Sequence, residues 1–272
     1  GLPLYALESG DPLDDFDIVG FTLQYELSYS NVVNMLELSG IPVFAADRGE
    51  DYPIIIGGGP CTYNPEPVAD FFDVFAIGEG EYMLTEFCAL YRDCRKKGMK
   101  KSEILRLASH LDGFYVPSLY DVAYNSDGTI NAVIPKYDDV PPVVTKRIVE
   151  DLDSAPFPTD FPVPYLETVH DRVTVEVFRG CIRGCRFCQA GMVYRPYREE
   201  SSDSINACAM ASCRNTGYNE ISLSALSISD YSEIDKLVDK LLSWTENEKI
   251  SLSLPSMRID AFYEELMKKV MS

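Results

Sequence analysis

The sequence predicts an α/β protein with an N-terminal doubly wound, Rossmann-like domain, a linker, and the first half of a partial β/α barrel. Strand-like and helix-like segments alternate at short spacing in residues 1–112 and again in residues 171–272, a pattern typical of parallel sheets covered by helices. Residues 113–170 differ, because two strand-like runs flank an Asn-Ser-Asp-Gly turn and prolines then recur. We interpret this middle region as a β-hairpin followed by a proline-rich, extended linker.

In the N-terminal domain, apolar runs predict three buried parallel strands, each followed by helical spacing. The expected strands cover residues 17–23, 53–59 and 72–80, and the expected helices cover 28–40, 65–72, 81–98 and 101–111. Glycines close two of these strands, in GGG at 57–59 and in GEGE at 78–81. Glycine there permits a tight turn or the close approach of a ligand. Neither motif is the G-x-G-x-x-G dinucleotide fingerprint, so a nicotinamide site is poorly supported.

The alternation resumes in the C-terminal domain. Strands are expected over residues 172–178, 220–224 and 250–255, and helices over 201–217, 230–249 and 259–271. Gly217 is the expected end of the first helix, and Asp230 is the expected N-cap of the second. Three strand–helix units in a row indicate the opening half of a β/α barrel, whose working face lies at the carboxyl ends of its strands.

Composition limits the classes of function. The net charge of −19 and the lack of a basic run make nucleic acid an unlikely partner. Neither a membrane-spanning run nor a signal peptide is present, so we expect a soluble, cytoplasmic protein without a membrane partner. In a reducing cytosol, clustered cysteine indicates metal binding or catalysis. The chain starts with Gly and stops within a helical pattern, from which we expect it to be a fragment.

Three of the eight cysteines lie within eight residues, in RGCIRGCRFC at 179–188. Cys181, Cys185 and Cys188 follow the first strand of the predicted half-barrel. A structural zinc site needs four ligands, and no second cysteine pair lies nearby, so the zinc interpretation is incomplete. Iron–sulfur clusters are held by cysteine thiolates. Three thiolates on a [4Fe-4S] cluster leave one iron free to bind a small molecule.

The motif C-x-x-x-C-x-(aromatic)-C, filled here by Cys181, Cys185, Phe187 and Cys188, resembles that of the radical SAM enzymes. The resemblance implies that the open iron chelates the amino and carboxylate groups of S-adenosylmethionine. An electron, from a donor such as flavodoxin or ferredoxin, then cleaves a carbon–sulfur bond to release methionine and a 5′-deoxyadenosyl radical. It also implies that the backbone around Phe187 meets the adenine.

Other positions are assigned to the cofactor by the same resemblance. Family members often carry Gly-Gly-Glu-like residues at the end of the second barrel strand, and here Ser224, Ala225 and Leu226 occupy that place. Because the glutamate is absent, backbone carbonyls and hydroxyls would have to bind the amino group of the cofactor, as in methylthiotransferase-like members. After the third strand, Ser256 and Arg258 are candidates, with Arg258 either gripping the cofactor carboxylate or serving as a surface arginine.

Arginines surround the cysteine motif, at positions 179, 183 and 186. Cations beside thiolates stabilise their negative charge and tune a cluster's potential. The alternative is that most of them are solvated loop residues.

The N-terminal domain resembles the cobalamin-binding-like domain that precedes the barrel in one branch of radical SAM proteins. IIIGGGP, DVFAIGEGE and CQAGMVYRP carry this resemblance, which extends to uncharacterised members named for a cobalamin-binding domain. The D-x-H-x-x-G motif with its axial histidine is absent, and His110 and His170 lie in other contexts. Cobalamin is therefore a candidate cofactor without that ligand, and the alternative is a fold kept for docking or for shaping the substrate site.

The remaining cysteines, Cys61, Cys88, Cys94, Cys208 and Cys213, are expected to pack in the core. For Cys61, which follows the GGG turn at the end of a strand, the alternative is that it faces a ligand. The leading functional hypothesis is a radical SAM enzyme of unknown substrate. One alternative is a methylthiotransferase- or methyltransferase-like enzyme that modifies RNA or a ribosomal component. Another is a non-catalytic iron–sulfur electron carrier or scaffold, and a zinc-stabilised structural protein comes last. No residue is identified as the one that faces the abstracted hydrogen.

Overall fold

The computed structural model describes residues 3–166 and 168–258, and the chain divides into two compact units between Ile148 and Val149. Each unit has its own hydrophobic core. Among the described helices, none combines the length and the apolar character needed to cross a bilayer.

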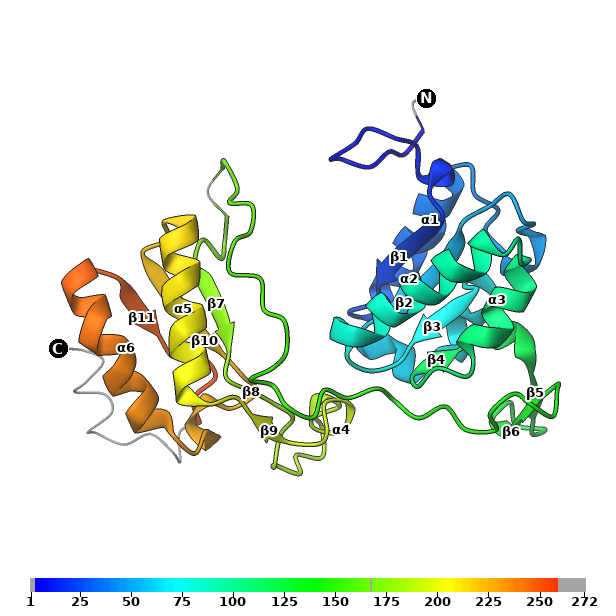
Figure 1. Ribbon diagram of the computed structural model, residues 1–272. Coiled ribbons are helices and arrows are strands. Elements are labelled where there is room, and N and C mark those ends of the chain that lie inside the picture. The colour runs from blue at the N-terminus through cyan, green and yellow to red at the C-terminus, as the bar shows by residue number, and fades with distance from the viewer. Residues whose placement is uncertain (1–2, 167, 259–272) are drawn as a thin grey trace. The chain divides into compact units, whose positions relative to one another are not determined.

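The first unit is built on a four-stranded sheet in the order β1-β2-β3-β4 (Figure 1). Its strands are β1 (Ile18–Thr22), β2 (Ile54–Gly58), β3 (Val74–Ala76) and β4 (Phe114–Tyr115). The first three run parallel, and β4 pairs antiparallel with β3. Its helices are α1 (Tyr29–Leu38), α2 (Gly80–Lys96) and α3 (Lys101–Ala108). The expected helix over 65–72 is a 3-10 segment, η5 (Glu66–Phe71).

Burial along β2 explains its apolar sequence. Ile54, Ile55 and Ile56 are all 5% exposed or less. Because successive side chains of a strand point to opposite faces, both faces of the sheet must be covered at β2, as is usual for parallel sheets. The rings of Phe72 and Phe75 pack beside it, with their centroids 4.9 Å apart.

A later segment of the first unit pairs with the chain just beyond β3. The backbone N–H of Arg147 donates to the carbonyl of Ile77 at 2.9 Å, and the N–H of Glu79 donates to the carbonyl of Arg147 at 3.0 Å. Gly78 lies between them with φ of 123°. A Cβ atom at Gly78 would lie 2.1 Å from the carbonyl oxygen of Arg147, so this pairing requires glycine.

Within the first unit, β5 (Tyr120–Tyr124) and β6 (Ile130–Pro135) pair antiparallel as a hairpin. Gly128 in its turn has φ of 83°. From β6 to β7, the described residues contain no further helix or strand.

The second unit contains a parallel sheet in the order β11-β10-β7, made of β7 (Val173–Glu176), β10 (Glu220–Ser224) and β11 (Ser251–Ser253). Helices α5 (Ser202–Thr216) and α6 (Ile234–Glu248) pack against each other and against the sheet (Figure 1). The hydroxyl of Ser201 accepts from the N–H of Ser204 at 3.2 Å, and Gly217 ends α5 with φ of 77°. The expected helix over 259–271 lies outside the described residues.

Two expectations are wrong. Helix α6 begins at Ile234 with Glu233 as its N-cap residue, whereas Asp230 lies in the preceding 3-10 turn, η7 (Ile228–Asp230). The carboxylate of Asp230 is not free to cap the helix, because it is paired with Arg183. Cys88 is exposed on α2 instead of buried in the core.

Candidate functional site

The cysteine loop, residues 181–188, is held between two short strands of the second unit. It follows β8 (Phe178–Arg179), which pairs antiparallel with β9 (Arg198–Glu199). Gly180 starts the loop with φ of 86°, and a Cβ atom there would lie 2.6 Å from the carbonyl oxygen of Pro196. The chain therefore enters the loop through a position that only glycine fits.

The three loop cysteines are partly exposed, and none forms a disulfide. The backbone N–H of Arg183 lies 3.4 Å from the sulfur of Cys181, and the N–H of Cys188 donates to the carbonyl of Cys185 at 3.1 Å. No three Cys, His, Asp or Glu side chains within residues 3–166 and 168–258 are gathered closely enough to hold a metal ion. The structure thus places the three thiols on one loop without drawing their sulfur atoms together.

The chemistry of this donor set nevertheless fits one particular group. Three thiols with no other covalent role can each ligate one iron of a cubane cluster. A closed tetrahedral zinc site would require a fourth ligand, which this loop does not contain. Phe187 stands between two of the cysteines in the sequence and is 92% exposed, so its ring is not used in packing.

Two of the neighbouring arginines are paired with carboxylates. The Nε atom of Arg183 donates to Asp230 at 3.0 Å, and a second nitrogen of the guanidinium contacts the other carboxylate oxygen. Arg179 forms a similar fork on Glu176, with its Nε atom 3.0 Å from one carboxylate oxygen and a second nitrogen 2.8 Å from the other. These two positive charges are therefore largely balanced by nearby carboxylates, which limits the compensation that they can offer to thiolates.

Asp230, which the sequence predicts only as a helix cap, belongs to this site. Its side chain is only 5% exposed. The hydrogen bonds from Arg183 hold the pKa of this carboxyl below its usual range, and the charge of Arg258 acts in the same direction. The hydroxyl of Tyr197 lies 3.1 Å from the backbone carbonyl oxygen of Asp230 and also contacts the carboxylate of Glu199. No local pattern indicates these contacts, because Arg183 and Asp230 are separated by 47 positions.

The end of β10 presents the next group of expected residues. Ser224 is the last residue of this strand, and it lies opposite Glu176, the last residue of β7. Ser224 is exposed, Ala225 is half-buried, and Leu226 is 42% exposed. Since β7 and β10 are parallel, these residues lie at the same end of the sheet as the strand that leads into the cysteine loop.

The chain after β11 reaches this end as well. Ser256 is exposed and has φ of 59°, in the left-handed region that non-glycine residues rarely adopt. The backbone N–H of Arg258 lies 3.4 Å from the hydroxyl oxygen of Ser229, in the turn after β10. The expected positions after β10 and β11 are thus linked to each other through this turn.

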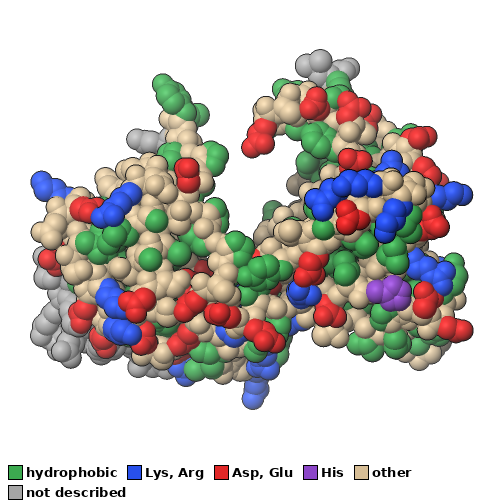
Figure 2. All heavy atoms as spheres, viewed as in Figure 1, with side chains coloured by type: hydrophobic (Ala, Val, Ile, Leu, Met, Phe, Trp, Pro, Cys, Tyr) green, Lys and Arg blue, Asp and Glu red, His purple; other side chains and the backbone are tan. Residues whose placement is uncertain are grey.

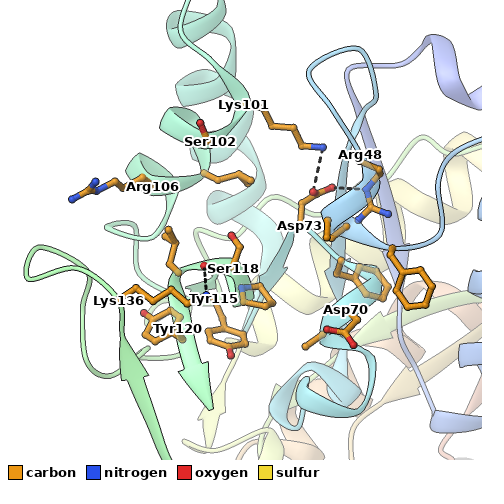
Figure 3. Close-up of a pocket in the computed structure, with 18 of the residues that line it drawn as sticks. Arg48, Asp70, Asp73, Lys101, Ser102, Arg106, Tyr115, Ser118, Tyr120 and Lys136 are labelled. Atoms are coloured by element: carbon orange, nitrogen blue, oxygen red, sulfur yellow. Dashed lines mark hydrogen bonds and ion pairs between the residues drawn. The ribbon is translucent and has the colours of Figure 1, made fainter. Parts of the chain in front are cut away.

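A cavity of about 1100 Å³ lies in the first unit, at the amino ends of β2 and β3. Figure 3 shows Lys101 and Arg48 both directed at Asp73, each with a nitrogen 3.2 Å from a carboxylate oxygen. Burial lowers the pKa of Lys101, and the charge of Asp73 opposes that effect. The cavity is at the opposite end of the sheet from the two glycine turns.

Those glycine turns, at the carboxyl ends of β2 and β3, are approached by the protein's own backbone. A Cβ atom at Gly59 would lie 2.9 Å from the carbonyl oxygen of Leu23. The backbone of Leu23 thus approaches Gly59 closely, as the backbone of Arg147 approaches Gly78. Gly58 faces open space. Neither turn contains a histidine: His110 is near Asp139 in the first unit, and His170 is near Arg172 in the second. The turns therefore supply no imidazole to a corrinoid.

Comparison with known families gives two matches. Residues 1–117 match the family model described as "Radical SAM proteins, N-terminal", and residues 175–271 match the model described as "Radical SAM superfamily". The second match includes the cysteine loop, the whole of β10 and β11, and the last two residues of β7.

One curated relative is the uncharacterized protein MJ0966 of Methanocaldococcus jannaschii, 26% identical over 97% of this chain. The chain spans 50% of that relative's length. Among solved structures, it is similar to TsrM of Kitasatospora setae, a radical S-adenosylmethionine methyltransferase with cobalamin and a [4Fe-4S] cluster bound. That match has a TM-score of 0.57 and 12% identity over 93% of this chain and 48% of TsrM.

A second similar structure is OxsB, a cobalamin-dependent S-adenosylmethionine radical enzyme. Its TM-score is 0.50 and its identity 15%, over 88% of this chain and 30% of OxsB. At these identities the likeness concerns the fold. It agrees with the expected α/β architecture of a Rossmann-like domain followed by part of a barrel.

Proposed function

Because this chain belongs to the radical SAM superfamily, we propose that it holds a [4Fe-4S] cluster through Cys181, Cys185 and Cys188 and cleaves S-adenosylmethionine reductively. When bound, the cluster supplies the electron and an open iron for the cofactor's amino and carboxylate groups. The cleavage would yield methionine and a 5′-deoxyadenosyl radical able to remove a hydrogen atom from a substrate. The protein's part is to position the cofactor and to exclude water.

The observation that carries the proposal is the placement of the three thiols. They lie on one partly exposed loop, framed by β8 and β9, and they have no other covalent role. The loop lies beyond the carboxyl end of β7, a strand of the parallel sheet, with only the short strand β8 between them. In β/α folds the carboxyl ends of parallel strands carry the functional groups.

The proposed contacts to S-adenosylmethionine come from this end of the sheet. The backbone near Phe187 is assigned to the adenine, and the chain at Ser224, Ala225 and Leu226 is assigned to the amino group. Ser256 and Arg258 are assigned to the carboxylate, for which an arginine offers paired donors. The exposure of Phe187 and Ser224 supports this assignment, since neither side chain is taken up by the core.

Cobalamin remains a candidate cofactor of the first unit. Its support is the likeness in fold to TsrM and OxsB, whose structures contain cobalamin. In this chain it would bind without an axial histidine from the glycine turns, because neither turn contains a histidine. An absorption spectrum of the protein after incubation with hydroxocobalamin and gel filtration tests this: a retained corrinoid band supports binding, and its absence overturns it.

For partners and location, we propose a cytoplasmic enzyme that accepts electrons from a flavodoxin or ferredoxin. All eight cysteines are free, as a reducing compartment favours. On the face shown in Figure 2, basic and acidic side chains are interspersed. This pattern and the net charge of −19 disfavour a nucleic-acid partner for this part of the protein. A methyltransferase-like action on RNA would depend on sequence outside this chain.

The decisive experiment is low-temperature electron paramagnetic resonance of the anaerobically reconstituted, dithionite-reduced protein, with and without S-adenosylmethionine. A reduced-cluster signal that changes when the cofactor is added supports direct access to the open iron. A cluster signal that stays the same would overturn the proposed cofactor site in this chain and favour an electron carrier. Absence of any cluster in the reconstituted protein would overturn the ligand assignment.

A further inference from the structure

Resting on the proposed function, we infer that Asp230 is a positioning residue for the cysteine loop, acting through Arg183. Arg183 lies between Cys181 and Cys185, and its backbone N–H contacts the sulfur of Cys181 at 3.4 Å. Its side chain leaves the loop and reaches Asp230 on the turn η7, beyond the end of β10. One residue therefore links the backbone of the ligand loop to a separate element of the sheet.

The backbone of Asp230 is itself fixed by contacts with neighbouring elements. The backbone N–H of Asp230 donates to the carbonyl of Ser227 at 2.9 Å, and its own carbonyl oxygen lies 3.1 Å from the hydroxyl of Tyr197, which also contacts the carboxylate of Glu199. The ring of Tyr197 packs on Phe178 of β8, with their centroids 4.9 Å apart. Asp230 is thus connected both to β8, which leads into the loop, and to the turn after β10.

The pair differs from an ordinary surface ion pair. The carboxylate is nearly buried, with 5% of the side chain exposed, and the guanidinium meets it with two nitrogens. Such forked arginine–carboxylate pairs fix geometry as well as contributing energy. Because 40% of the Arg183 side chain is exposed, it can turn to water when the carboxylate is replaced. Loss of the pair should therefore free the loop without unfolding the unit.

The pair also connects the two halves of the proposed cofactor site. Asp230 follows Ser224, Ala225 and Leu226 by a few residues, and the same turn contacts the backbone of Arg258 through Ser229. A loop that carries three ligands must hold one geometry for all of them. Residues that orient ligands in this way commonly change metal affinity by about 10–100-fold when replaced.

The test compares Asp230→Asn, Arg183→Gln and Arg183→Lys with the unaltered full chain. Glu220→Gln is the matched control, because it breaks the ion pair of Arg172 with Glu220 at the amino end of β10, away from the loop. After anaerobic reconstitution, bound iron and sulfide are measured, followed by the chelator concentration that removes half of the iron. The reduction potential and the unfolding midpoint are recorded for each protein.

We expect Asp230→Asn and Arg183→Gln to lose iron at about tenfold lower chelator concentration and to shift the reduction potential. Asp230→Asn should do so at an unchanged unfolding midpoint, whereas Arg183→Gln removes the partner of a nearly buried carboxylate and should also lower the midpoint. Arg183→Lys should lie between them and the unaltered protein, since lysine cannot form the fork. Glu220→Gln should match the unaltered protein. Variants that keep the original chelator resistance and potential would overturn the inference.

Failure of the proposed function gives a different result, namely an unaltered protein that takes up no cluster. The effect of the Arg183–Asp230 pair on the loop can then still be measured in the apoprotein, by amide hydrogen exchange over residues 181–188. Faster exchange in Asp230→Asn than in Glu220→Gln would show that Asp230 holds the loop. Equal exchange in the two variants would overturn the inference as well.

Discussion

Gly78 and Arg147 pair through their backbones more closely than any other residue type at position 78 would allow. A Cβ atom at Gly78 would meet the nitrogen of Arg147 at 2.6 Å as well as its carbonyl oxygen at 2.1 Å. Gly78, two residues beyond the end of β3, thus makes room for a later part of the same unit, because residues 77–79 pair with the chain at Arg147.

Gly78→Ala is therefore expected to destabilise the first unit by at least about 2 kcal/mol, because it combines an unfavourable φ with a backbone clash. Urea unfolding measures the change. The control is Gly98→Ala, since Gly98 also has a positive φ, of 71°, but a Cβ atom there would meet nothing within 4 Å. Equal destabilisation by the two substitutions would contradict the importance of the pairing.

Asp73→Asn should destabilise the first unit strongly. Asp73 accepts from both Arg48 and Lys101, and the side chains of all three are at most 10% exposed. Removing the shared carboxylate leaves two nearly buried cations without their counter-ion, which costs about 3–5 kcal/mol in comparable pairs. The free energy of unfolding in urea provides the measurement.

Asp93→Asn is the matched control for that prediction. Asp93 pairs with Arg92 on the surface of α2, where both side chains are more than half exposed, and such pairs contribute little. Its unfolding midpoint should stay that of the unaltered protein. A similarly small change in Asp73→Asn would show that the buried trio does not stabilise the fold.

The free energy of unfolding of the second unit should fall as the pH rises from 9 to 11, because the thiol of Cys213 is buried. Burial raises the pKa of this thiol from an ordinary value of 9.0 to about 11. Below pH 9 the thiol is protonated in both states, but between pH 9 and 11 the unfolded chain loses its proton first. The stability contributed by the protonated thiol therefore falls across this window, by up to about 2 kcal/mol.

The measurement is urea unfolding of the unaltered protein and of Cys213→Ala at pH 8 and at pH 11. The difference between the two proteins should shrink at the higher pH, because the variant has no thiol to titrate. Tyrosines that titrate in the same range affect both proteins alike and cancel. A difference that stays constant with pH would refute the prediction.

Cys185→Ala should abolish cluster assembly, because it leaves two of the three proposed ligands. Cys208→Ala provides the comparison, since Cys208 lies on α5 outside the cysteine loop. Iron and sulfide per chain after anaerobic reconstitution report the outcome. Equal cluster content in the two variants would exclude Cys185 as a ligand.

Local rules predicted much of the fold from the sequence. Gly217 ends α5 in the left-handed conformation that the rule for helix ends anticipates. The expected strand over 220–224 agrees with β10, and the run of isoleucines at 54–56 is buried on both faces as expected of a parallel strand. These features depend on neighbours a few residues away, which is the range that sequence patterns describe.

Features that depend on distant contacts could not be predicted. Asp230 is an acceptable N-cap by every local criterion, yet its carboxylate is bound to Arg183, 47 positions earlier. Similarly, nothing in the sequence GEG indicates that Arg147 fills the space that Gly78 leaves. In the candidate site, the motif identified the three cysteines, but the residues that hold their loop are known only from the fold.

The openness of the cysteine loop also has a consequence in air. Before a cluster forms, Cys181, Cys185 and Cys188 are partly accessible thiols within eight residues of one another. Thiols of this kind are prone to oxidation by peroxide to sulfenic acid and then to disulfides with a neighbour. Protein purified aerobically can therefore lose its cluster-forming capacity while keeping its fold, and treatment with a thiol reductant before reconstitution should recover that capacity.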